Sequence, residues 1–114
     1  MNKVITNELL SKGFVVVNGK WSYKGKKMCV IDFYADWCQP CKPQETVLDE
    51  LSKKYDEIEF LKVNVEEEYE LAEIFSIKSL PTVIICGKEN SRFSGFTSSQ
   101  KVEDAIKNQI EIFV

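Results

Sequence analysis

Cys38 and Cys41, in the segment Cys38-Gln39-Pro40-Cys41, are the residues of this sequence best suited to chemistry. Two thiols at this spacing favour reversible disulfide formation, in which a thiolate attacks a disulfide sulfur. The pair follows an apolar run at 30–34, which predicts a buried strand, and precedes residues 47–51, whose apolar positions recur at helical spacing. This order places the thiols at the first turn of a helix, where free N–H groups and the helix dipole favour a thiolate.

Three other uses of a cysteine pair fit the sequence less well. A zinc site needs two further ligands, but the chain has no histidine, and Cys29 and Cys86 stand alone in apolar, strand-like runs. A c-type haem attachment needs a histidine after the second cysteine, where this chain has Lys42. Two cysteines acting only as small buried hydrophobes are disfavoured because their neighbours are not core-like. Redox chemistry is the preferred interpretation.

The composition predicts one globular domain spanning residues 1–114, with 44% hydrophobic and 29% charged residues. A net charge of −3 argues against nucleic acid as a partner. No apolar stretch approaches the roughly 18 residues of a membrane-spanning helix, so no membrane association is expected.

The N-terminus lacks the uninterrupted apolar stretch of a signal peptide, because polar residues interrupt it at positions 7, 8, 11 and 12. We therefore expect a cytoplasmic protein. In that compartment a Cys-x-x-Cys pair is more often catalytic or metal-binding than a structural crosslink.

Strand-like and helix-like segments alternate along the chain. Strands are predicted at 2–5, 14–17, 28–34, 58–65, 81–86 and 91–96, with turns at 18–19 and 87–90. Helices are predicted from Thr6 or Asn7 to near Gly13, at 40–54 and 67–75, and after a cap at Ser98 or Ser99. Residues 20–27 are left without an assignment. This order predicts an α/β fold with helices on both faces of a sheet and a late antiparallel edge.

Three segments resemble the thioredoxin family. Residues 32–42, Asp-Phe-Tyr-Ala-Asp-Trp-Cys-Gln-Pro-Cys-Lys, are similar to the family's active-site segment, with Gln39 where glycine is usual. Ser79-Leu80-Pro81-Thr82 is similar to the loop that holds a cis-proline facing the disulfide, and Gly95 matches a glycine of the closing strand. The resemblance covers residue 28 to the C-terminus. It implies a thioredoxin fold, with a central mixed sheet, helices on both faces and a C-terminal antiparallel hairpin.

The resemblance also implies a mechanism. Cys38, expected to be the more exposed thiol at the helix start, is the predicted nucleophile, and Cys41, one turn deeper, is predicted to resolve the mixed disulfide. Pro40 restricts the loop between them. The reactive group is then a redox-active disulfide between Cys38 and Cys41, and no bound cofactor is expected. The implied partners are proteins that contain disulfides and a thioredoxin reductase.

Asp32 is the third predicted catalytic residue. A carboxylate inside an apolar strand is desolvated, which raises its pKa and allows it to accept the proton of Cys41. A carboxylate at the strand edge, satisfied by water or an amine, is the alternative. Lys62 matches a family lysine near that aspartate, so it is a candidate for pairing with Asp32 and supporting proton transfer. An exposed strand lysine remains an equal alternative.

The predicted substrate-facing surface surrounds the cysteine pair. The resemblance implies a cis peptide bond before Pro81, which leaves the backbone of Leu80 free to pair with an extended peptide. Trp37 is interpreted as a flank of the docking surface, or alternatively as a packing residue beneath the loop. The full set is Trp37, Gln39, Pro40, Leu80, Pro81, Gly95 and Phe96.

The chain departs from the family pattern near the cysteines. Gln39 adds a side chain where glycine leaves room for a partner, so partner choice and redox potential are expected to differ. Pro43 falls early in the predicted helix and Thr46 replaces a kink-forming proline, which predicts a bend elsewhere or an irregular start. Gln44 and Glu45 replace apolar residues and predict a more polar helix face. Cys29 and Cys86 are additional and are expected to be buried, reduced thiols.

These observations predict a thiol–disulfide oxidoreductase that reduces protein disulfides. A specialised oxidoreductase with one dedicated partner, or a more oxidising isomerase-like protein, is the alternative. A non-catalytic adaptor with this fold is disfavoured, because both cysteines and Asp32 are present.

Overall fold

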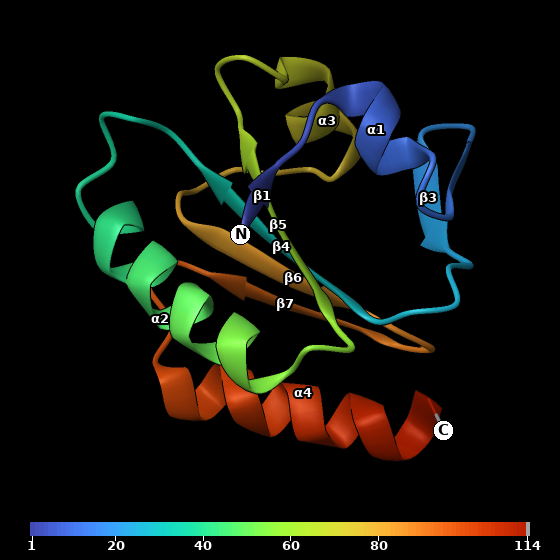
Figure 1. Cartoon of the computed structure of the whole chain (residues 1–114). Coiled ribbons are helices and arrows are strands. Elements are labelled where there is room, and N and C mark those ends of the chain that lie inside the picture. Colours follow the sequence, from blue (N-terminus) through green and yellow to red (C-terminus); the bar gives the residue numbers. More distant parts are fainter. Residues whose placement is uncertain (114) are drawn as a thin grey trace.

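A five-stranded sheet forms the centre of the molecule in a computed structural model that describes residues 1–113 (Figure 1). Its strand order is β1-β5-β4-β6-β7. The bounds are β1 Asn2–Lys3, β4 Cys29–Tyr34, β5 Glu59–Asn64, β6 Thr82–Cys86 and β7 Asn90–Ser94. β1, β5 and β4 run parallel, whereas β6 and β7 pair antiparallel, so the sheet is mixed as expected.

Four helices flank this sheet: α1 Thr6–Leu10, α2 Cys41–Lys54, α3 Tyr69–Ile74 and α4 Ser99–Phe113. One core joins α1 and α3 to one face of the sheet through residues such as Leu9, Leu71 and Phe75. A second core joins α2 and α4 to the other face through residues such as Leu48 and Ile106. Side chains alternate between the two cores along β4, which explains why this central strand is apolar at nearly every position. The predicted α/β fold, with a mixed sheet and helices on both of its faces, is therefore confirmed.

The helix after the cysteine pair is continuous from Cys41 to Lys54. Pro43 lies in its first turn, where a missing N–H leaves no hydrogen bond unmade. The irregular start expected from the sequence is confirmed only at its entry, where Cys41 N–H bonds to Cys38 O at 3.3 Å and Lys42 N–H bonds to Gln39 O at 3.2 Å, three residues back instead of four. Its buried residues, Cys41, Gln44, Leu48 and Leu51, follow one stripe.

The segment left unassigned in the sequence contains a strand. β2 (Phe14–Val17) and β3 (Lys20–Tyr23) form a separate two-stranded sheet. The predicted turn between them is confirmed, and Asn18 and Gly19 both have positive φ, 54° and 74°. Phe14 packs against Trp21 and Tyr23, and both Phe14 and Trp21 contact Phe75, the residue that follows α3, with ring centroids 4.6 Å apart for Trp21 and Phe75. This aromatic contact fixes the hairpin against the main core.

Other expectations need small corrections. β1 ends at Lys3, α3 begins at Tyr69, and β7 spans residues 90–94. The N-cap of α1 is Ile5, because the Thr6 hydroxyl instead donates to Glu68 at 2.9 Å. The predicted cap of α4 is confirmed at Ser98, whose hydroxyl oxygen accepts the Lys101 N–H at 3.3 Å.

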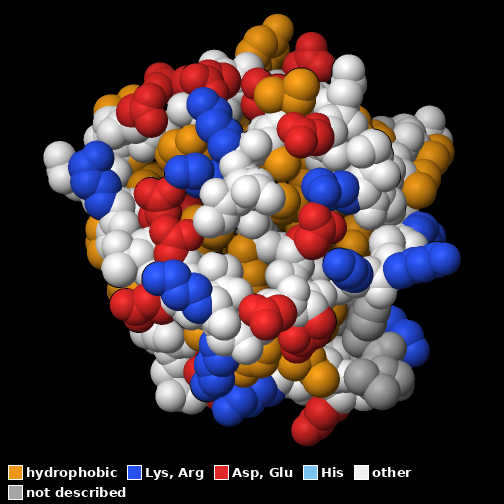
Figure 2. All heavy atoms as spheres, in the orientation of Figure 1, with side chains coloured by type: hydrophobic (Ala, Val, Ile, Leu, Met, Phe, Trp, Pro, Cys, Tyr) orange, Lys and Arg blue, Asp and Glu red, His pale blue; other side chains and the backbone are white. Residues whose placement is uncertain are grey.

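Acidic and basic side chains are interspersed over the face shown in Figure 2. Among residues 1–113, none of the helices is both long and apolar enough to cross a membrane.

Candidate functional site

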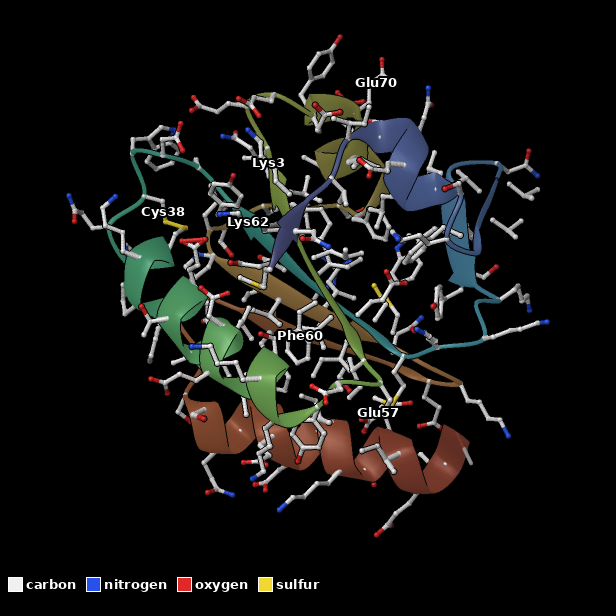
Figure 3. The ribbon with its side chains drawn as sticks, viewed as in Figure 1. Lys3, Cys38, Glu57, Phe60, Lys62 and Glu70 are labelled. Carbon is white, nitrogen blue, oxygen red and sulfur yellow. A yellow bond between two sulfur atoms is a disulfide. The ribbon has the colours of Figure 1, made fainter. Side chains whose placement is uncertain are left out.

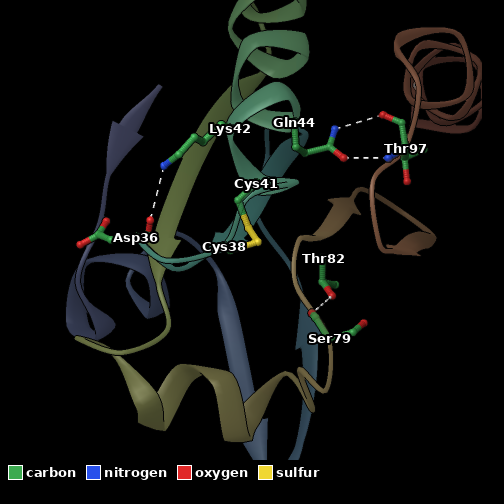
Figure 4. The surroundings of a disulfide bond; sticks show 8 residues. All are labelled: Asp36, Cys38, Cys41, Lys42, Gln44, Ser79, Thr82 and Thr97. Atoms are coloured by element: carbon green, nitrogen blue, oxygen red, sulfur yellow. Dashed lines mark hydrogen bonds between the residues drawn. A yellow bond between two sulfur atoms is a disulfide. The ribbon is translucent and has the colours of Figure 1, made fainter.

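Cys38 and Cys41 form a disulfide between the end of β4 and the start of α2 (Figure 4). Their Cα atoms are 5.4 Å apart. The turn that carries them is closed by backbone hydrogen bonds, Cys38 N–H to Ala35 O at 3.2 Å and Cys41 N–H to Cys38 O at 3.3 Å. Cys41 is the first residue of the helix. The pair thus occupies the position predicted from the apolar patterns on either side of it.

The expected difference in exposure between the two cysteines is not present. Cys38 is 3% exposed and Cys41 is 4% exposed in this disulfide form. Cys38 is covered because Tyr34, Ala35, Val65 and Leu80 pack around the pair. Burial alone therefore gives no reason to rank one sulfur above the other as the nucleophile.

Asp32 lies on β4 behind the disulfide and is 1% exposed. Its Oδ1 atom has no hydrogen-bond partner among the described residues. The pKa of Asp32 is raised from 3.8 to about 7, chiefly by desolvation and also by the charge of Glu45, while the charge of Lys62 opposes this rise. The raised pKa expected from the apolar neighbours is confirmed, and the strand-edge alternative is wrong because the carboxyl is buried. A carboxyl with this pKa can exchange a proton near neutral pH.

Lys62 is adjacent to Asp32 on the neighbouring strand but pairs with another acid. The β4–β5 register sets Asp32 opposite Lys62. The Lys62 Nζ instead donates to Glu45 Oε2 of α2 at 2.5 Å and lies 5.4 Å from the centre of the Tyr34 ring. The expected Asp32–Lys62 pair is therefore corrected, because a surface carboxylate on the helix reaches the ammonium group. Figure 3 shows Cys38 and Lys62 in the same region of the molecule.

A cavity of about 250 Å³ joins these groups. It is lined by both cysteines, the acids Asp32, Asp36 and Glu45, the lysines Lys42 and Lys62, and Tyr34 and Ala35. The buried carboxyl and the disulfide thus share one space with a charged pair at its rim. This arrangement allows a proton to pass between Asp32 and a thiol of the pair.

The loop before β6 contains the predicted cis peptide bond, between Leu80 and Pro81. Leu80 packs against the cysteine pair. Within residues 1–113, neither the N–H nor the C=O of Leu80 forms a hydrogen bond to another backbone group. Gly95, with φ of 82°, donates its N–H to Pro81 O at 2.7 Å and brings the end of β7 beside this loop. Leu80, Pro81 and Gly95 therefore lie together as predicted.

Exposed side chains surround the disulfide. Trp37 is 66% exposed, so it lies on the surface and the alternative of packing beneath the loop is wrong. Gln39 and Pro40 are also exposed, as is Phe96 at 50%. Trp37 borders a groove of about 310 Å³ together with Val65, Ala72, Ile77, Lys78, Ser79 and Leu80. An apolar groove beside the disulfide can accept side chains of a bound peptide.

Gln44 is a site residue that the sequence analysis misplaced. It was expected on a polar helix face, but it is 0% exposed. Its Nε2 donates to Thr97 O at 3.1 Å, and its Oε1 accepts the Thr97 N–H at 2.8 Å (Figure 4). The helical spacing from Gln44 to Leu48 and Leu51 could have predicted its burial, because this spacing places the amide on the buried stripe of α2.

Cys29 and Cys86 face each other across β4 and β6 but are free thiols. They are 1% and 0% exposed. Burial raises the pKa of Cys29 to about 12 and also raises that of Cys86. The expectation of buried, reduced thiols is confirmed. Cys29 begins β4 and its register partner Cys86 ends β6, whereas the disulfide follows the other end of β4. Within residues 1–113, no cluster of three His, Cys, Asp or Glu side chains is placed to hold a metal ion.

Comparison with known sequences identifies one family. The family model described as Thioredoxin matches residues 18–111. A thioredoxin of Borreliella burgdorferi is 36% identical over 106 residues, which cover 89% of this chain and 90% of that protein. A thioredoxin of Mycoplasma genitalium is 33% identical over 88 residues, covering 75% of this chain and 86% of that protein.

Solved structures agree with the sequence comparison. The thioredoxin of Fasciola hepatica superposes with a TM-score of 0.75 at 30% identity, over 96% of this chain and 99% of that one. Chloroplastic thioredoxin z gives a TM-score of 0.79 over 97% and 95% of the two chains, and at 21% identity it supports the fold alone.

Proposed function

The chain belongs to the thioredoxin family of thiol–disulfide oxidoreductases, and from this premise we propose that it reduces protein disulfides through Cys38 and Cys41. The observation that carries the proposal is the disulfide at the start of α2 with the buried carboxyl of Asp32 behind it. We further propose a cytoplasmic location and a thioredoxin reductase as the electron donor, since a protein that acts as a reductant requires a reducing compartment.

In the first step the reduced protein attacks its substrate. The Cys38 thiolate attacks one sulfur of a substrate disulfide, a mixed disulfide forms, and the other substrate sulfur leaves as a thiolate. The sequence order supports Cys38 as the attacking residue, because it precedes the helix while Cys41 lies inside the first turn. The helix N-terminus stabilises negative charge on the sulfur.

In the second step Cys41 releases the product. Asp32 accepts the proton of the Cys41 thiol, and the Cys41 thiolate attacks the Cys38 sulfur of the mixed disulfide. The second substrate thiolate leaves, so the substrate gains two electrons and the Cys38–Cys41 disulfide returns. A pKa of about 7 suits Asp32 to this task, because the carboxyl can take up and release the proton near neutral pH. A dithiol of the reductase then restores the starting state.

The substrate surface in this proposal is the exposed rim around the disulfide. Leu80 presents its backbone beside the cysteines, and an extended peptide can pair with it as an added strand. Trp37 and Gln39 flank this path on the surface, and the groove beside Trp37 receives neighbouring side chains of the peptide. Recognition of this kind depends mainly on backbone, which allows many partners.

A specialised oxidoreductase with a dedicated partner is the second candidate. The exposed side chain of Gln39 favours it, because this residue stands at the point where a partner's backbone approaches.

Reduction of insulin by dithiothreitol tests the proposal. The wild-type protein should accelerate insulin precipitation, whereas Cys38→Ser should give the uncatalysed rate. Equal rates for both proteins would show that the fold serves as a non-catalytic adaptor. The reduction potential of the Cys38–Cys41 couple then separates a reductase from a more oxidising, isomerase-like protein.

A further inference from the structure

Three charged side chains from three elements meet at the cavity behind the disulfide. Asp32 of β4 and Lys62 of β5 are register partners, and Glu45 of α2 lines the same cavity. The Lys62 Nζ lies 2.5 Å from Glu45 Oε2, while Asp32 Oδ1 is left without a partner. The Lys62 ammonium group is therefore paired with Glu45, the more exposed carboxylate, and not with the buried Asp32.

The two carboxylates beside Lys62 differ in their exposure to solvent. Asp32 is 1% exposed, so its charge is poorly solvated, whereas the side chain of Glu45 is 40% exposed. The attraction between two charges is greater where the effective dielectric constant is lower, although moving Lys62 inward also removes water from its ammonium group. The flexible stem of Lys62 starts beside Asp32, so a lysine without Glu45 can turn toward this buried acid or toward Asp49 of α2, whose charge also acts on Lys62.

We propose that Glu45 is a positioning residue that holds Lys62 at the rim of the cavity and so leaves Asp32 without a cationic partner for proton exchange with Cys41. The proposal rests on the proposed roles of Cys41 and Asp32. The electrostatics agree in sign, because Glu45 raises the pKa of Asp32 and Lys62 lowers it.

The other groups that face Asp32 leave this assignment intact. Asp49 of α2 also raises the pKa of Asp32. Its charge is already paired, because Asp49 Oδ1 accepts a hydrogen bond from the Met1 amino group at 2.9 Å. From β6, the register partner of Asp32 is the apolar Val83. The cavity is also lined by Cys41, whose thiol is the proton donor in the proposed step, and by Asp36 and Lys42. Of the two lysines that line the cavity, Lys62 is the one in register with Asp32 and the one whose charge lowers the pKa of Asp32.

Glu45 and Lys62 exchange no proton in the proposed step. The proton moves from the Cys41 sulfur to Asp32 and then to solvent through the cavity, while the electron pair moves from the Cys41 thiolate to the departing substrate sulfur. Glu45 thus acts through the position of Lys62 and is not itself an acid or base of the reaction.

The test measures the titration of Asp32 in the reduced protein by NMR, without substrate, for three variants. Glu45→Gln should lower the midpoint of Asp32 by about one pH unit, because it removes a repelling charge and frees Lys62. Lys62→Met should raise the midpoint. Glu50→Gln is the matched control, since it removes the same charge from an exposed position on the same helix and should leave the midpoint unchanged.

The second readout is the pH dependence of mixed-disulfide resolution in single turnovers. Its acid limb should move to lower pH in Glu45→Gln and to higher pH in Lys62→Met. An Asp32 midpoint in Glu45→Gln equal to that in Glu50→Gln overturns the proposal, as does a shifted midpoint with an unchanged rate profile. Because the titration requires no substrate, a failure here is distinct from a failure of the insulin assay.

Discussion

Gln44 of α2 and Thr97, which lies between β7 and α4, are joined by two hydrogen bonds through one buried carboxamide, at 2.8 Å and 3.1 Å. The amide satisfies both the N–H and the C=O of Thr97, as a neighbouring strand would. Thr97 follows Gly95 and Phe96, so this contact joins the loop that we propose to face the substrate to the helix that carries Cys41. The geometry of the proposed site thus depends on a polar contact inside the core.

Replacing Gln44 should destabilise the fold more than an ordinary amide substitution. Gln44→Met keeps similar volume but leaves two buried backbone groups of Thr97 unsatisfied, which costs about 2 to 4 kcal/mol. Urea unfolding measures the loss, with Gln100→Met as control because Gln100 is exposed and its side chain bonds to the exposed Asp104. Equal stability of the two variants would mean that the Gln44–Thr97 contact contributes nothing.

Asp32→Asn should change stability in a pH-dependent way. The native pKa of Asp32 is raised from 3.8 to about 7, so its neutral form is favoured by the fold. The stability due to this carboxyl is complete below about pH 4 and is lost as the pH rises through 7. The variant should therefore match the wild type near pH 3 and exceed it by up to about 4 kcal/mol at pH 8. A difference independent of pH contradicts this account.

Asp32→Asn should also slow the release of product, because asparagine cannot accept the Cys41 proton. Stopped-flow decay of a mixed disulfide measures this step. A variant that gains stability and keeps the wild-type rate shows that Asp32 has no part in proton transfer.

Cys29 and Cys86 should resist alkylation in the native protein. Both are buried and their pKa values are raised, so little thiolate is present at pH 8. Iodoacetamide should label Cys38 in the reduced protein and leave these two thiols unlabelled until denaturant is added. Peptide mass spectrometry distinguishes the sites, and native labelling of Cys29 at the rate of Cys38 disproves the prediction.

Gln39→Gly should raise the turnover of a generic substrate such as insulin. Gln39 is exposed beside the disulfide, so its side chain occupies space that a partner's backbone needs. The reduction potential should change only modestly. Equal or lower insulin turnover in the variant identifies Gln39 as a neutral replacement.

Local patterns were sufficient to predict the position of the cysteines and the burial of Asp32. Both depend on β4 and on α2 directly after it. The spacing of apolar residues in these two elements is visible within a stretch of about 25 residues, without knowledge of distant contacts. The cis bond before Pro81 was predictable only through the resemblance to a family, since a proline at the start of a strand is usually trans.

Long-range contacts account for the features that sequence reasoning missed. β3 packs against the main core through the contact of Trp21 with Phe75, and these two residues are far apart in the chain. Lys62 is held by Glu45, and the sequence could not rank that helix carboxylate against Asp32. Cys38 is as buried as Cys41 because Leu80, from a distant loop, covers it.

Trapping a mixed disulfide tests the central claim most directly. Cys41→Ser, reduced and mixed with a disulfide-containing protein, should form a covalent adduct that mass spectrometry locates at Cys38, whereas Cys38→Ser should form none. The claim rests on the place of Cys38 ahead of α2 and of Cys41 within its first turn. An adduct through Cys41 in Cys38→Ser, with none in Cys41→Ser, would contradict the assignment of the two roles.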